Sequence, residues 1–216
     1  MTVAGFAAPG TPAAPATPPA IPVKTIVFFG DSITAGYGLN LSQEAAYPAL
    51  IQKKIEAAGL PWRVVNAGLS GETTAGGLRR IDWILRNRAD VFVLALGGND
   101  GLRGLPVGPM EDNLHGIFVK VRAKYPEAKL VIAGMRMPPS MGEYATQFDA
   151  VFAKVAAKDG ATLVPFLLLD VAGVAEMNQD DAIHPNAAGH RKIAETLWPT
   201  IEGVIRPTEK KQAANP

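Results

Sequence analysis

Four short segments of the chain contain residue types that could perform acyl transfer. Ser32 lies in Gly-Asp-Ser, Gly71 in SGET and Asn99 in GGND, and Asp181 and His184 lie three residues apart in DDAIHP. A serine nucleophile needs a base to take its proton, an acid that orients the base, and donors aimed at the developing oxyanion. The sequence contains each of these groups, so the question is whether the fold brings them together.

The composition limits the other possibilities. A chain of 216 residues with 48% hydrophobic content predicts one domain with a full core. Lys and Arg number 21 against 20 Asp and Glu, and there is no run of four basic residues, so nucleic acid is not an expected partner. With no cysteine, the chain has neither a thiol nucleophile nor a thiolate metal site.

The two ends differ from the middle of the chain. Residues 1–22 are rich in Ala and Pro, without a basic start or an apolar run typical of a signal peptide, and are interpreted as a flexible leader. Residues 207–216 are interpreted as a polar tail, which leaves 23–206 as the domain. No stretch approaches the roughly 20 apolar residues of a membrane span.

The elements that must position the polar segments follow from the apolar pattern. Five short apolar runs predict strands that are buried on both faces: Thr25–Gly30, Arg63–Gly68, Val91–Gly98, Lys129–Met135 and Thr162–Phe166. Helical spacing of apolar residues occurs at Tyr47–Ile55, Leu114–Val121 and Phe148–Val155. A last helix is expected from about Asn186 to Ile205, with Pro185 or Asn186 as its start signal.

This alternation predicts an α/β protein, a three-layer α/β/α sandwich. Its centre is a five-stranded, parallel, doubly wound sheet of the flavodoxin-like type, because parallel strands require long crossover connections. Ligands of such sheets bind beyond the carboxyl ends of the strands, where the strand order reverses. The segments of Ser32, Gly71, Asn99 and His184 all follow predicted strands, so we expect them at this edge.

Several other kinds of site lack their motifs. GLSGE at Gly68–Glu72 fails the G-x-S-x-G pattern, and no G-x-G-x-x-G or Walker pattern follows the first strand. The three histidines share no metal-ligand spacing, and neither metal nor cofactor is expected. A phosphoacceptor signalling domain would need an acid pair after strand one and a lysine after strand five, but Asp31 is a lone acid and Phe166–Leu169 are apolar.

The longer strings FGDSITAGYG, VVNAGLSGETTAGGLRR, LGGNDGLRG and QDDAIHPN resemble, in this order, the conserved blocks of the SGNH (GDSL) hydrolase superfamily. Within it, the chain is most similar to the bacterial thioesterase I, lysophospholipase and arylesterase group, over about residues 24–205. The resemblance implies Ser32 as nucleophile, His184 as general base and Asp181 as its orienting acid. It also implies an oxyanion hole made by the Ser32 and Gly71 backbone N–H groups and the Asn99 amide. It favours a periplasmic or secreted location.

Some residues allow two interpretations. Asp180 competes with Asp181 as the acid that orients His184, and Asp181 is favoured by the motif spacing. His115 and His190 are expected to be surface or packing residues. Asp31 is expected to anchor the nucleophile turn by accepting backbone N–H bonds.

The substrate-binding candidates are less specific. The segment Gly101–Pro109, with its three glycines, is expected to be a loop that could close over the site. Two apolar segments, 135–141 and 167–177, are hypothesised to line an acyl groove, the alternative being ordinary packing beneath the helices. The candidate substrate contacts are Asp31, Asp100, Leu102, Met137, Pro138, Leu168 and Ile183.

The motifs, together with what the resemblance implies, predict a serine esterase for aryl and short-to-medium acyl esters, with thioesters and lysophospholipids as further candidate substrates. A carbohydrate acetyl esterase of the same superfamily is the main alternative, although Trp62, Trp83 and Trp198 lie outside the predicted site loops. A non-catalytic lipid- or glycan-binding relative is a second alternative. The sequence indicates no oligomeric state.

Overall fold

The computed structural model describes residues 23–206, so the predicted leader and tail lie outside the described residues. The strands are β1 Lys24–Gly30, β2 Trp62–Gly68, β3 Val91–Ala95, β4 Lys129–Ala133 and β5 Thr162–Val164. The longer helices are α3 Tyr47–Ala57, α4 Thr74–Ile84, α6 Val107–Lys124, α7 Glu143–Asp159 and α8 Ala187–Ile205. The short helices are α1 Ser32–Ala35, α2 Ser42–Ala45 and α5 Gly98–Leu102, together with 3₁₀ turns at Pro139–Met141 and Ala175–Met177.

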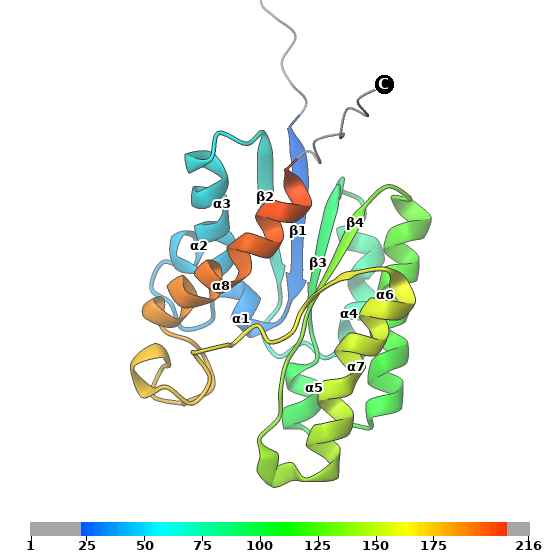
Figure 1. The fold of residues 1–216 in the computed structure, drawn as a ribbon, viewed down its shortest axis with the longest axis vertical. Coiled ribbons are helices and arrows are strands. Elements are labelled where there is room, and N and C mark those ends of the chain that lie inside the picture. The colour runs from blue at the N-terminus through cyan, green and yellow to red at the C-terminus, as the bar shows by residue number, and fades with distance from the viewer. Residues whose placement is uncertain (1–22, 207–216) are drawn as a thin grey trace, which may run out of the picture.

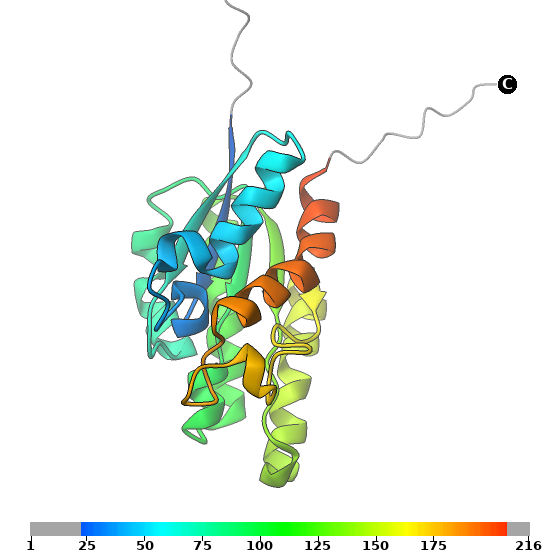
Figure 2. The same ribbon diagram turned by 90° about the vertical axis from the view of Figure 1, so that its left-hand side faces the viewer.

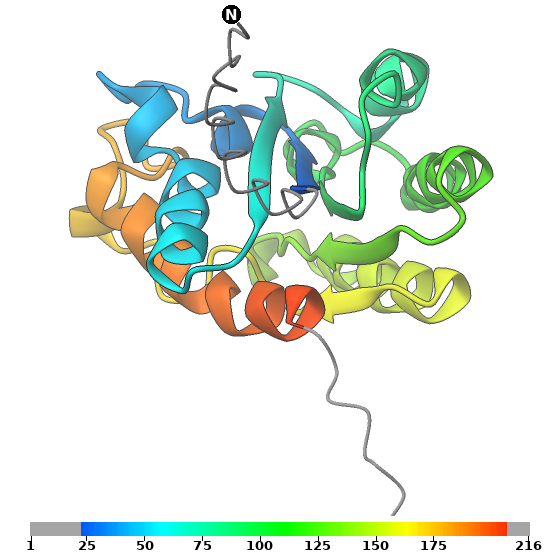
Figure 3. The same ribbon diagram turned by 90° about the horizontal axis from the view of Figure 1, so that it is seen from above.

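The strands form one parallel sheet in the order β2-β1-β3-β4-β5. Helices α3 and α8 pack together on one face, the one turned to the viewer in Figure 2. Helices α4, α6 and α7 cover the opposite face, and the view from above shows the sheet between the two layers (Figure 3). The predicted three-layer, doubly wound sandwich with flavodoxin-like strand order is confirmed.

Burial differs between the central and the edge strands. The side chains of β1 after Lys24, and all of those of β3, are buried, as predicted for strands covered on both faces. The prediction is wrong for β2 and β5, where exposed and half-buried positions occur. Both are edge strands, and Gln52 of α3 accepts from Val64 N at 2.6 Å, which satisfies part of the free edge of β2.

Three helices and the start of α8 agree with the sequence, whereas α4 was not predicted. Asn186 caps α8 by accepting from the backbone N–H groups of Ala188 and Gly189. In α4, Gly76 and Gly77 weaken the helical signal. The cap at Thr73, whose side chain accepts from Gly76 N, was the available signal.

The strand order reverses beside β1, which lies between β2 and β3. The carboxyl ends of the strands lie at the lower edge in Figure 1, where α1 and α5 follow β1 and β3. The expected loop at Gly101–Pro109 is wrong, because α5 and α6 take up most of it and leave only residues 103–106 between them. Among the described helices, none is long and apolar enough to cross a bilayer.

Candidate active site

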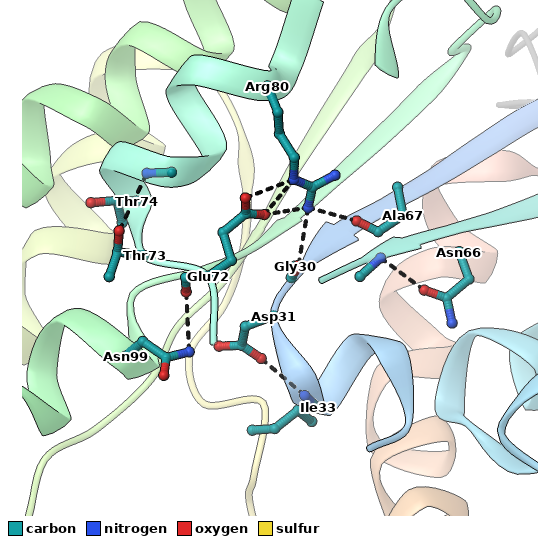
Figure 4. Close-up of polar contacts among 12 residues, drawn as sticks. Gly30, Asp31, Ile33, Asn66, Ala67, Glu72, Thr73, Thr74, Arg80 and Asn99 are labelled. Carbon is teal, nitrogen blue, oxygen red and sulfur yellow. Dashed lines mark hydrogen bonds and ion pairs between the residues drawn. The ribbon is translucent and has the colours of Figure 1, made fainter. Parts of the chain in front are cut away.

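The turn after β1 places Ser32 at the first position of α1. Gly30 is required there, because a Cβ atom would lie 2.1 Å from Thr34 Oγ1 and 2.7 Å from the Ala95 carbonyl oxygen. Asp31 caps α1 by accepting from Ile33 N at 3.0 Å (Figure 4). Ser32 is 8% exposed, and its N–H, in the first turn of a helix, has no intrahelical acceptor. The turn thus offers both a hydroxyl and a backbone donor.

The segment before α8 brings an imidazole to that hydroxyl. His184 Nε2 lies 2.9 Å from Ser32 Oγ, and His184 Nδ1 lies 2.6 Å from Asp181 Oδ2. The other oxygen of Asp181 accepts the backbone N–H groups of Ile183 and His184, both at 2.9 Å. Ala182, between them, adopts a left-handed φ of 57°. This compact turn gives the order Ser, His, Asp that acyl transfer requires.

The hydrogen bonds explain the charge on the acid. The backbone N–H of His184, its imidazole and the Ile183 N–H together lower the pKa of Asp181 to about 2. An ionised Asp181 accepts from Nδ1–H, which leaves the lone pair of Nε2 directed at Ser32 Oγ. Among the acidic side chains of residues 23–206, Asp181 bonds to this imidazole and its neighbour Asp180 does not.

Asp31 has a different environment from Asp181. Burial raises its pKa to about 6, against the opposing effect of its hydrogen bond from Ile33 N. The carboxylate is 4% exposed and is used as a helix cap, which agrees with its expected anchoring role. A substrate has little access to it.

Two further donors lie near the nucleophile turn. Gly71 has a φ of 77°, and Arg103 Nη2 donates to its carbonyl oxygen at 3.0 Å. Asn99 Nδ2 donates to the carbonyl oxygen of Glu72 at 3.1 Å (Figure 4). An amide carries two N–H bonds, so Asn99 retains one for a ligand. The resemblance assigns these two groups, together with the N–H of Ser32, to an oxyanion hole.

The remaining substrate candidates fall into two groups. Asp100 is 2% exposed and accepts from Thr74 N at 2.9 Å and Thr74 Oγ1 at 2.6 Å, so it caps α4. Met137 and Leu168 belong to the hydrophobic core, which favours the packing alternative over an open acyl groove. Leu102, Pro138 and Ile183 are exposed.

The other histidines do not join the site. His115 Nδ1 bonds to Asp159 at 2.8 Å, and His190 is buried with Nδ1 accepting from Tyr47 N at 3.2 Å.

Two residues close to the site were not predicted from the sequence. They are Tyr37, whose ring lies 4.7 Å from that of His184, and Arg103, which donates to the Gly71 carbonyl oxygen. Both lie within the strings FGDSITAGYG and LGGNDGLRG, but nothing in their type or spacing indicated a contact with the site. Within 23–206, no group of three or more acidic or histidine side chains is arranged to hold a metal ion.

Comparison with known proteins gives the family. Residues 28–192 match the family model of the GDSL-like Lipase/Acylhydrolase family. The chain belongs to this family. Esterase TesA of Pseudomonas aeruginosa is 41% identical over 184 residues, covering 84% of this chain and 90% of the relative. A relative from Escherichia coli K12 named thioesterase 1/protease 1/lysophospholipase L1 is 35% identical over 183 residues, covering 84% of this chain and 85% of the relative.

Solved structures of GDSL-like hydrolases have the same fold. The crystal structure of TesA superposes with a TM-score of 0.79 and 40% identity, covering 84% of this chain and 99% of that chain. A psychrotrophic esterase EstA from Pseudoalteromonas gives a TM-score of 0.78 with 34% identity, covering 84% and 98%. The predicted superfamily and its similarity to the thioesterase and arylesterase group are confirmed.

Proposed function

We propose that the protein is a serine esterase that hydrolyses aryl and short-to-medium acyl esters through an acyl-Ser32 intermediate. The observation that carries the proposal is the hydrogen-bonded chain from Ser32 Oγ through His184 to Asp181, at 2.9 and 2.6 Å. A serine that only stabilised the fold would need its bond to His184 and would not need the second bond, from His184 to Asp181. The complete set of contacts among the three side chains, together with the donors that the resemblance assigns to Ser32, Gly71 and Asn99, supports nucleophilic catalysis.

The reaction follows from the positions of these groups. Ser32 Oγ attacks the ester carbonyl while His184 Nε2 takes its proton, and the carbonyl oxygen becomes an oxyanion held by the Ser32, Gly71 and Asn99 donors. The oxyanion collapses, the bond to the leaving oxygen breaks, and the imidazolium protonates that oxygen. Water then attacks acyl-Ser32 by the same route, which releases the acid and restores the hydroxyl.

The substrate class is supported by the site surroundings and the relatives. Leu69, Leu102 and Ile183 are exposed apolar side chains, close in sequence to Gly71, Asn99 and His184. Exposed apolar groups beside a nucleophile favour aryl or acyl substituents over polar ones. Relatives named esterase, arylesterase, and thioesterase and lysophospholipase support thioesters and lysophospholipids as further substrates.

The carbohydrate alternative has less support. Trp62 begins β2, at the edge of the sheet opposite the site, and Trp83 lies at the end of α4 that is distant from Thr74. Sugar-binding sites commonly stack aromatic rings on the substrate, but these tryptophans are not at the carboxyl edge of the sheet. The experiment must therefore distinguish hydrolysis of a sugar ester from hydrolysis of an aryl or acyl ester.

The experiment measures hydrolysis of p-nitrophenyl esters from acetyl to palmitoyl by the wild type, Ser32→Ala and Ser42→Ala. Ser42, at the start of α2 and outside the proposed site, is the matched control. We expect Ser32→Ala to lose about 10⁴-fold or more in kcat with an unchanged circular dichroism spectrum. A folded Ser32→Ala with the wild-type rate would exclude Ser32 as nucleophile.

Two other outcomes identify the alternatives. A folded wild type that is inert toward these esters but releases acetate from acetylated xylan would be a carbohydrate esterase. A folded wild type inert toward both substrates would support a binding role.

A further inference from the structure

An ion pair lies directly behind the loop that carries Gly71. Arg80 Nε on α4 donates to both carboxylate oxygens of Glu72, at 2.7 and 2.6 Å, and Arg80 Nη2 also contacts this carboxylate (Figure 4). The Glu72 side chain is 4% exposed and that of Arg80 is 21% exposed. A charged pair removed from water to this extent costs desolvation energy, so its contribution to stability alone does not explain it.

The same guanidinium also holds the ends of two strands. Arg80 Nη2 donates to the Ala67 carbonyl oxygen at 2.8 Å and lies 3.4 Å from that of Gly30. Its planar group lies over the ring of Phe29, 4.1 Å from the ring centre. Ala67 lies near the end of β2, and Gly30 begins the turn that carries Ser32.

The backbone of Glu72 completes the connection to the third donor. Its carbonyl oxygen accepts from Asn99 Nδ2, so the position of Glu72 sets the orientation of the Asn99 amide. Glu72 also directly follows Gly71 in the chain. One guanidinium is therefore linked, through one or two contacts, to each of the three segments that supply an oxyanion donor.

We infer that Arg80 and Glu72 are positioning residues that fix the three oxyanion donors relative to one another. This inference rests on the function proposed above. Oxyanion stabilisation depends on donors placed before the reaction, and a displacement of about 1 Å can cost about 10² in rate. Neither side chain needs to touch the substrate, because each acts through Gly30, Gly71 or Asn99.

The kinetic test compares Arg80→Met with Arg79→Met. Arg79 is the matched control, because it is an exposed arginine on the same helix. For p-nitrophenyl acetate we expect Arg80→Met to lower kcat by about 10- to 10²-fold with KM within about twofold, since the lost interactions operate in the transition state. Arg79→Met should keep wild-type values. A loss of kcat that only follows the fraction of unfolded protein would overturn the inference.

A double-mutant cycle with Asn99→Ala separates positioning from general destabilisation. If Arg80 acts through the Asn99 amide, Arg80→Met should cost several-fold less in the Asn99→Ala background than in the wild type. Equal losses in both backgrounds would contradict the proposed linkage. If Arg80→Met does not fold, Arg80→Lys and Glu72→Gln enter the same cycle, because each removes part of the linkage while retaining polar groups.

A spectroscopic measurement tests the linkage without turnover. In ¹⁵N–¹H spectra, the signals of the Asn99 side-chain amide and the Gly71 N–H should shift in Arg80→Met and not in Arg79→Met. Unchanged signals in a folded Arg80→Met would refute the inference, whatever the activity. A folded wild type that hydrolyses no ester would instead refute the proposed function, while these spectra would still decide whether Arg80 orders the two donors.

Discussion

The carboxylate of Asp181 holds His184 at two points. Its Oδ2 lies 2.6 Å from Nδ1 of the imidazole, while its Oδ1 accepts the backbone N–H of the same residue at 2.9 Å. The main chain and the ring of His184 are thus fixed by one group within a single turn. Because these bonds lower the pKa of Asp181 to about 2, the carboxylate stays ionised at neutral pH.

Asp181→Asn should lower kcat by about 10³- to 10⁴-fold with little change in fold. The amide oxygen can still accept the backbone N–H of His184, but its NH₂ group would face Nδ1 and favour the tautomer that carries its proton on Nε2. Steady-state kinetics with p-nitrophenyl acetate measure the loss. Asp180→Asn is the control, and a larger loss from Asp180→Asn would assign the orienting role to Asp180.

Gly71→Ala and Gly104→Ala form a matched pair. Both glycines have left-handed φ values, 77° and 61°, and an added Cβ would meet only Arg103 Nη2 at 3.9 Å or nothing within 4 Å. Each substitution should cost about 1–2 kcal/mol of stability. Only Gly71→Ala should also lower kcat, by about 10- to 10²-fold, because relaxation of the backbone turns its N–H away. Equal kcat values for the two variants would remove Gly71 from the oxyanion hole.

The parallel sheet and the clustering of the polar segments could both be predicted from the sequence, and the second follows from the first. Ser32 and His184 are 152 positions apart, yet parallel strands end at the same edge of a sheet, so residues that follow different strands meet there. The start of α8 was predicted from a local signal, because Asn186 is a residue type that caps helices.

Other features depend on tertiary packing and could not be predicted from the sequence. Met137 and Leu168 lie in apolar segments after strands, and apolar composition is the same whether a side chain packs in the core or lines a groove. Arg80 and Arg79 are adjacent and identical in type, and only the helix phase determines which one reaches Glu72. The helices α5 and α6 replaced a predicted loop because glycine-rich segments can still be helical when packing supports them.

Asp100 is expected to affect stability rather than substrate binding. Its carboxylate is buried and accepts two hydrogen bonds from Thr74 at the start of α4. Asp100→Ala should lower the free energy of unfolding by about 2–3 kcal/mol, because a charge-assisted bond is lost and a buried N–H is left without its acceptor. Urea unfolding measures this change. An increase in KM without a loss of stability would restore Asp100 as a substrate contact.

The stability of the protein should depend on pH through His190. This side chain is 1% exposed, and burial lowers its pKa to about 4, below the value of 6.5 for the unfolded chain. As the pH falls from 6.5 to about 4, the unfolded chain therefore takes up the proton first, and stability is lost. The complete loss, reached once the pH is below about 4, would be about 3 kcal/mol, at ~1.36 kcal/mol per pKa unit.

The protonation of Asp31 has the opposite effect on stability, over an overlapping range of pH. Its pKa is raised to about 6 by burial, so the folded protein takes up this proton before the unfolded chain does, and stability is gained as the pH falls below about 6.

The wild type alone would show only the sum of the His190 and Asp31 contributions. His190→Asn isolates the His190 contribution, because the amide oxygen can still accept from Tyr47 N while the ionisable group is removed. Urea unfolding between about pH 7 and pH 4.5 should show a smaller loss of stability in His190→Asn than in the wild type, since both share the contribution of Asp31. Parallel pH curves would mean that folding does not lower the pKa of His190.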